Sequence, residues 1–198
     1  MPDRVYLDLW FRAGPHALAR LRRALSAFPF SPRRPGIAGA RIFALDWAQP
    51  PLLDETYPGG LSLDELWPEL ENALGAACDL DDFAVELTAH WDLWHFQNAA
   101  WNLTPVPVLI VAAGARFDPA GRDPDTGQVR IEWVDSGLFL ADSAPWTRPT
   151  HQRIRANLES LLGYVKKLER SGLSKRKVST ESGWDLVQQL QARAYPLQ

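Results

Sequence analysis

The chain has 198 residues, of which 46% are apolar and 23% are charged, and its formal net charge at pH 7 is −3. The length suits one hydrophobic core, and the composition is that of a globular protein rather than a disordered one. The longest apolar run, residues 106–115, contains Pro107 and Gly114 and is much shorter than the roughly 20 residues that span a bilayer. We therefore expect residues 1–198 to form a single domain, with no transmembrane helix and no membrane partner.

The first expected strand and helix follow each other at the N-terminal end. Apolar and polar residues alternate over Val5–Phe11, which is the period-two pattern of a half-buried strand. Leu18, Leu21 and Leu25 then recur at helical spacing, and the proline-rich stretch 29–35 ends this pattern. We expect the helix to lie on the sheet.

Residues 40–47 predict a second strand. Residues 49–60 contain three prolines and two consecutive glycines, and we expect them to form a long loop of the kind that can border a site. Ser62 and Glu65 have the spacing of a capping box, which predicts the start of a second helix. Pro68 lies too deep for a first-turn proline, so this helix either kinks at Pro68 or begins there.

Two long segments predict the centre of the sheet. Residues 83–96 alternate throughout, whereas residues 106–113 are nearly continuously apolar, as in a central strand that is covered on both faces. Residues 118–128 are rich in turn-forming residues and lead to a further strand over 129–134. A hairpin is expected there.

The C-terminal part changes character. From Ile154 to Leu168 the apolar residues form one helical stripe, Gly172 suits the C-cap, and a second helix is expected over Trp184–Ala194. The expected order is β-α-β-α-β-β-β-α-α. It predicts an α+β fold with a mixed or antiparallel sheet, helices packed on one face, and a partly ferredoxin-like arrangement.

Charge is unevenly distributed along the chain. Residues 148–198 hold ten basic and four acidic residues, a net charge of +6, whereas residues 1–147 hold eleven and twenty, a net charge of −9. We expect residues 149–198 to form a basic helical extension that packs on the acidic sheet body. The alternative is that this extension binds an acidic partner, but nucleic acid is disfavoured because no recognised nucleic-acid-binding module accompanies it.

Three of the expected strands place polar and aromatic side chains on one face. In an extended strand over 86–96 alternate residues point to opposite faces, and the non-core face receives the more polar set. If the strands at 5–11 and 129–134 are neighbours of this one, carboxylates, an imidazole, an arginine and aromatic rings gather on that face. The candidate ligand-binding residues are Tyr6, Asp8, Trp10, Glu86, His90, Asp92, Trp94, Arg130 and Glu132.

This polar face has two interpretations. His90 can act as an acid or a base near neutral pH, neighbouring carboxylates can tune it or bind a hard cation, and tryptophan rings can stack on a ligand. Alternatively, the face is the solvated side of an antiparallel sheet. The chain contains nine tryptophans, most of them expected in the core, and this excess favours a binding surface because aromatic residues are enriched at such surfaces.

No motif specifies a reaction, a cofactor or a metal. His90 and His95 are five residues apart, which places them on opposite faces of a strand and off the metal-binding geometry of a helix. The sequence has no cysteine pair and no HExxH, P-loop, GxGxxG or GxSxG motif. Catalytic residues and cofactors therefore stay unassigned.

Several features favour a cytoplasmic protein. The N-terminus has no basic segment followed by the apolar segment of a secretory signal, and the single cysteine, Cys78, cannot form an internal disulfide. Only four of the 21 basic residues are lysines, a bias that we interpret as that of a GC-rich bacterial genome.

We expect a non-enzymatic protein that binds a small molecule or a protein partner over the aromatic and acidic sheet face. This hypothesis requires an exposed pocket lined by Trp10 or Trp94. The second hypothesis is a metal-assisted hydrolase that uses Asp8, Glu86, His90 and Asp92. The third is an interaction protein that acts through its basic C-terminal helices.

Overall fold

Seven antiparallel strands form one sheet in the computed structural model, which describes residues 3–12, 16–75, 81–121, 126–140, 145 and 147–182. The strands are β1 (Val5–Phe11), β2 (Ile37–Ala44), β3 (Leu53–Leu61), β4 (Phe83–Gln97), β5 (Ala100–Ala113), β6 (Val129–Trp133) and β7 (Leu173–Thr180). Their order across the sheet is β3-β2-β4-β5-β6-β1-β7. The predicted α+β class is confirmed, with an antiparallel sheet.

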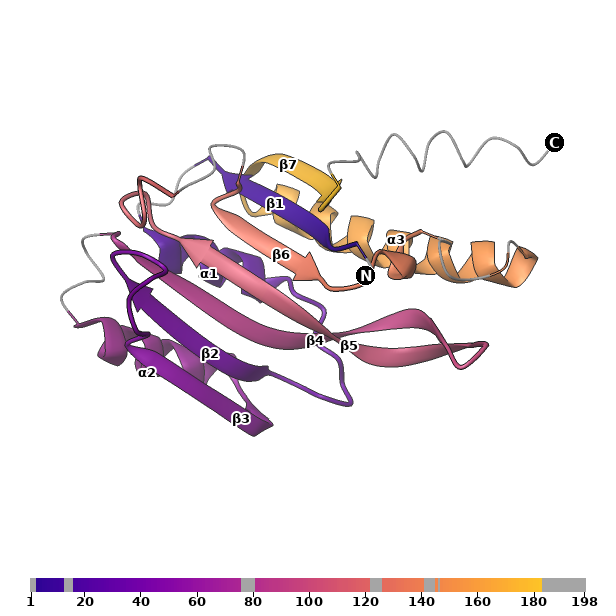
Figure 1. Cartoon of the computed structure of the whole chain (residues 1–198), viewed down its shortest axis with the longest axis horizontal. Helices are drawn as coiled ribbons and strands as arrows, with labels where there is room; N and C mark the ends of the chain where they lie inside the picture. Colours follow the sequence, from indigo (N-terminus) through magenta and orange to yellow (C-terminus); the bar gives the residue numbers. More distant parts are fainter. Residues whose placement is uncertain are drawn as a thin grey trace.

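The described residues form three α-helices, α1 (Ala17–Ser26), α2 (Leu63–Leu74) and α3 (Arg148–Arg170), and Figure 1 shows them on one side of the sheet. The main core lies between that side and the helices. Its members include Leu7, Leu87, Ile110 and Ile131 from the strands and Leu21, Leu70 and Leu161 from the helices. The opposite side, which we call the open face, therefore carries the alternate residues of each strand.

Local sequence signals explain where the helices begin. The capping box of Ser62 and Glu65 is present, and α2 continues through Pro68. The Thr147 hydroxyl accepts the backbone N–H of Thr150 at the start of α3. Asn157 then fastens α3 to β4, because its amide accepts from the backbone N–H of Trp94 and donates to the Trp94 carbonyl, both at 2.8 Å.

The prediction of a long loop over residues 49–60 is wrong in its second part, because Leu53–Leu61 forms the edge strand β3. Asp54, Glu55 and Thr56 pair with β2 through their backbones, while most of the β3 side chains are exposed. The strand therefore lacks an apolar alternation. Pro58 is tolerated because an edge strand has backbone N–H groups that no neighbour needs.

The C-terminal extension is only partly helical. α3 is present as predicted, but Leu173–Thr180 forms β7, which pairs with β1. The expected helix at Trp184–Ala194 lies outside the described residues. Over the described ranges the order is β-α-β-β-α-β-β-β-α-β apart from one short 3-10 helix, so the ferredoxin-like arrangement is not confirmed. Within the described part of the chain, no helix is long and apolar enough to cross a membrane.

Candidate functional site

A row of charged side chains crosses the open face of the sheet. In the observed register Asp8 pairs with Arg130, Arg130 with Val111, and Val111 with Glu86. Their strand neighbours, such as Leu7, are in the core, so these side chains point away from the helices. The condition set from the sequence is met only in part, because β1 and β6 are neighbours but β5 lies between β6 and β4.

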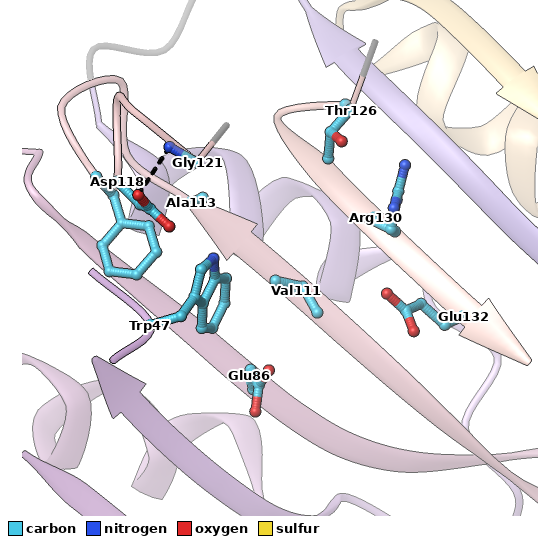
Figure 2. Close-up of a pocket in the computed structure, with 11 residues that line it drawn as sticks. Trp47, Glu86, Val111, Ala113, Asp118, Gly121, Thr126, Arg130 and Glu132 are labelled. Atoms are coloured by element: carbon cyan, nitrogen blue, oxygen red, sulfur yellow. Dashed lines mark hydrogen bonds between the residues drawn. The ribbon is translucent and has the colours of Figure 1, made fainter. Parts of the chain in front are cut away.

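A pocket of about 230 Å³ lies on the open face at one end of β5 (Figure 2). Val111 and Ala113 of β5 belong to its lining, and Glu86 and Glu132 rise from the strands on either side of β5. Loop residues complete its wall. The lining residues are Trp47, Glu86, Val111, Ala113, Phe117, Asp118, Gly121, Thr126, Gly127, Arg130 and Glu132.

Arg130 is held at one side of the pocket by an ion pair with the buried carboxylate of Asp8. Its Nε donates to Asp8 Oδ1 at 2.8 Å and its Nη2 donates to Asp8 Oδ2 at 3.1 Å, while Asp8 is 1% exposed. The Asp8 carboxylate also accepts the backbone N–H of Gly127, where a Cβ would lie 2.6 Å from the backbone nitrogen of Leu9. Only glycine therefore lets this loop approach β1. The Tyr6 ring lies 4.6 Å from the guanidinium.

Glu86 and Glu132 are partly withdrawn from water. Their side chains are 17% and 15% exposed, and burial is the main cause that raises the pKa of each. Arg41, at 3.2 Å from Glu86, acts against this shift, as do Arg130 and then Arg4, at 3.7 Å, for Glu132. The charge of Glu86 further raises the pKa of Glu132.

The lining of the pocket is anionic. It contains three carboxylates, Glu86, Asp118 and Glu132, and one guanidinium, that of Arg130, which is already paired with Asp8. Asp118 Oδ1 accepts the backbone N–H of Gly121 at 3.0 Å. The side chains that face the pocket therefore carry more negative than positive charge.

An aromatic wall borders the carboxylates. The ring of Trp47 lies 5.0 Å from Phe43 and 4.8 Å from Phe117, both in edge-to-face geometry. Phe43 and Phe117 are buried, whereas Trp47 remains 42% exposed. Among the described tryptophans, Trp47 lines the pocket rather than Trp10 or Trp94.

Sequence reasoning missed Trp47, Phe117 and Asp118. Trp47 was expected at the end of the second strand, but β2 ends at Ala44 and Trp47 lies in the following turn. Asp118 has a φ of 42°, and it begins the segment that was expected to form turns. That turn signal and the number of tryptophans were the available indications, and neither specifies that the two loops meet.

The nine predicted site residues fall into two groups. Tyr6, Asp8, Glu86, Arg130 and Glu132 surround or support the pocket. The other four lie beside basic side chains elsewhere: His90 beside Arg34 (3.4 Å), Asp92 beside Arg33 (3.0 Å), Trp94 beneath Arg153 (3.5 Å from the ring) and Trp10 beneath Lys175 (4.5 Å from the ring). Burial, followed by the charge of Arg34, lowers the pKa of His90.

The two neighbouring histidines of β4 have separate partners. His95 Nε2 lies 2.8 Å from Asp135, whereas His90 faces Arg34. In the described ranges, no group of three or more His, Cys, Asp or Glu side chains has the arrangement of a metal site.

Comparison of the chain with protein-family models, with curated proteins and with solved structures identified no match. The chemistry of the pocket is therefore the basis for the function proposed below.

Proposed function

We propose that the protein binds a small organic cation, such as a primary amine, in the pocket between Glu86 and Glu132. The observation that carries this proposal is the placement of two poorly hydrated carboxylates on either side of Val111 in a concave site. The volume of about 230 Å³ suits a small molecule. The proposal specifies the predicted non-enzymatic binding role.

The charges around the pocket support a cationic ligand. Arg41 and Arg4 are about half exposed, at 47% and 51%, so water screens their attraction to Glu86 and Glu132. An ammonium group inside the pocket donates directly to both carboxylates, and such charge-assisted hydrogen bonds are about twice as strong as neutral ones. The ligand thus replaces hydration that burial has removed.

The contacts of the other acidic residues favour binding over metal-assisted hydrolysis. Both oxygens of Asp8 accept hydrogen bonds from Arg130, and Asp92 pairs with Arg33. His90 faces Arg34 rather than a carboxylate. Of the four residues in the hydrolase hypothesis, Glu86 is the one that lines the pocket.

Thermal unfolding and calorimetry with butylamine test the proposal, and 1-butanol serves as a neutral ligand of similar shape. A ligand at 100 times its dissociation constant stabilises the folded state by about 2.7 kcal/mol. We expect such a shift with the amine, a much smaller one with the alcohol, and loss of binding in the Glu86→Gln/Glu132→Gln variant.

Glu55→Gln provides the matched control, because Glu55 is an exposed carboxylate on β3. This variant should bind butylamine as the wild type does. Equal binding of the amine and the alcohol, or unchanged binding in the double variant, would contradict the proposal.

A further inference from the structure

We infer that the ligand is an aromatic amine whose ring stacks on Trp47 while its ammonium group lies between Glu86 and Glu132. This inference rests on the proposed function, because it specifies the apolar part of the same small cation. It predicts that the pocket distinguishes an arylalkylamine from an alkylamine of equal charge.

A second apolar cluster on the open face supports it. Phe43, Ala84 and Phe117 are buried there, separately from the main core, and Ala113 packs against them. Trp47 contacts Phe43 and Phe117 of this cluster in edge-to-face geometry. Its side chain stays 42% exposed, and a large ring exposed beside a pocket is typical of residues that dominate binding energy.

The position of Trp47 matches a ligand that also reaches the carboxylates. Figure 2 shows the indole on the same side of the sheet as Glu86 and Val111, with Glu132 beyond Val111. Strands in a sheet are about 4.8 Å apart, so β4 and β6 lie about 10 Å apart across β5. A molecule with an aromatic ring on a short aminoalkyl chain has about the length of this span, and Trp47 and Glu132 line the same pocket.

Hydrogen bonds hold the loop that carries Trp47. Asp46 Oδ1 accepts the backbone N–H groups of Ala48 and Gln49, at 2.8 and 3.1 Å. The carbonyl of Leu45 accepts the backbone N–H of Asp118 at 2.7 Å, which ties this loop to the loop that carries Phe117. Because these hydrogen bonds already position the ring, ordering it on binding costs little conformational entropy.

The test compares dissociation constants for 2-phenylethylamine, ethylamine and 2-phenylethanol by calorimetry. We expect 2-phenylethylamine to bind about tenfold more tightly than ethylamine, since an aromatic contact with its buried area is worth about that factor. The neutral alcohol should bind more weakly than 2-phenylethylamine. Trp47→Leu should reduce the tenfold preference to threefold or less, and Trp47→Phe should keep part of it.

Trp10→Leu is the matched control, because Trp10 lies on the open face beneath Lys175. It should retain the tenfold preference, and circular dichroism should show that all three variants are folded. Equal affinity for the two amines overturns the inference and leaves the small-cation function standing. Failure of both amines to bind overturns both proposals. An unchanged preference in Trp47→Leu overturns stacking on Trp47. The same holds if no amine binds and the wild type instead forms a dimer that Trp47→Leu abolishes.

Discussion

Burial makes protonation of the two pocket carboxylates more favourable in the folded protein than in the unfolded chain. For Glu132 the largest cause of the raised pKa is burial, and Arg130 and Arg4 oppose it. Groups held in this way reduce folding stability at neutral pH, which is a common property of binding sites. The proposed ammonium ligand offsets this loss, because it pairs with the charged carboxylate.

A Glu132→Gln variant tests this at the scale of one residue. Between the ordinary pKa of 4.5 and the raised pKa of the folded state, the folded protein binds more protons than the unfolded chain. The free energy of unfolding therefore falls as pH rises through this window and stays lower above it. The neutral amide removes this loss, so we expect the variant to be more stable than the wild type at about pH 7.5, with the difference vanishing near pH 4.5.

Urea denaturation across this pH range measures the difference. Glu55→Gln controls for the loss of one negative charge at an exposed position. Parallel stability curves for the wild type and Glu132→Gln would show that burial of this carboxylate does not affect folding.

Asp8 stabilises the folded protein, whereas the charge of Glu132 destabilises it. The Asp8 carboxylate holds Arg130 in place beside the pocket. Replacement by asparagine leaves Arg130 with a weaker partner, and we expect a loss of about 2–3 kcal/mol, less than a fully buried pair because Arg130 is 23% exposed. Glu159→Gln breaks the exposed pair with Arg155 and should cost less than about 0.5 kcal/mol. Equal losses in the two variants, measured by urea denaturation, would mean that burial of the pair is unimportant.

At the scale of elements, the approach of neighbouring segments places the aromatic wall. Gly114 follows β5, and its backbone N–H donates to the carbonyl of Phe83 at 2.9 Å. A Cβ at this position would lie 2.0 Å from the carbonyl oxygen of Asp81. The turn that presents Phe117 to the pocket therefore depends on a glycine.

Two glycine-to-alanine substitutions with opposite expected effects on the free energy of unfolding test this close approach. Gly114→Ala should destabilise the protein by about 1–3 kcal/mol, the usual effect of overpacking. Gly163→Ala, in α3 where a Cβ meets nothing within 4 Å, should stabilise it by about 0.5–1 kcal/mol. Thermal unfolding of both variants decides the matter, and a neutral Gly114→Ala would mean that the turn can shift freely.

The elements that sequence reasoning located are those with strong periodicity of their own. Val5–Phe11 and Ile154–Leu168 carry their burial pattern in the chain itself, and both appear as β1 and α3. β3 and β7 were missed because at least half of the side chains in each are exposed. Backbone pairing with a neighbour stabilises such edge strands, and no local apolar pattern reports it.

At the scale of the whole molecule, the sheet depends on a strand from the far end of the chain. β7 pairs with β1 from Val5 to Phe11 and contributes the buried side chains of Leu173 and Thr180. Without β7, β1 becomes an exposed edge directly beside β6, which carries Arg130 and Glu132.

Two truncated chains isolate this contribution. A chain that ends after Ser171 lacks β7, whereas a chain that ends after Ser182 retains it. We expect the shorter chain to be less stable than the longer one by at least about 3 kcal/mol, from lost hydrogen bonds and apolar burial. Urea unfolding followed by circular dichroism compares them, and equal stability would contradict the structural role of β7.

By itself, the sequence determined the α+β class and the alternation that directs Asp8, Glu86 and Glu132 to one face, because side-chain direction along a strand is a local property. Only the tertiary structure decided which of these residues meet. The strand order brings β4, β5 and β6 together, and loop closure places Trp47 over Phe43 and Phe117. The contact of Trp47 with Phe117 and the pairing across β4, β5 and β6 join residues far apart in the chain, so no local pattern encodes them.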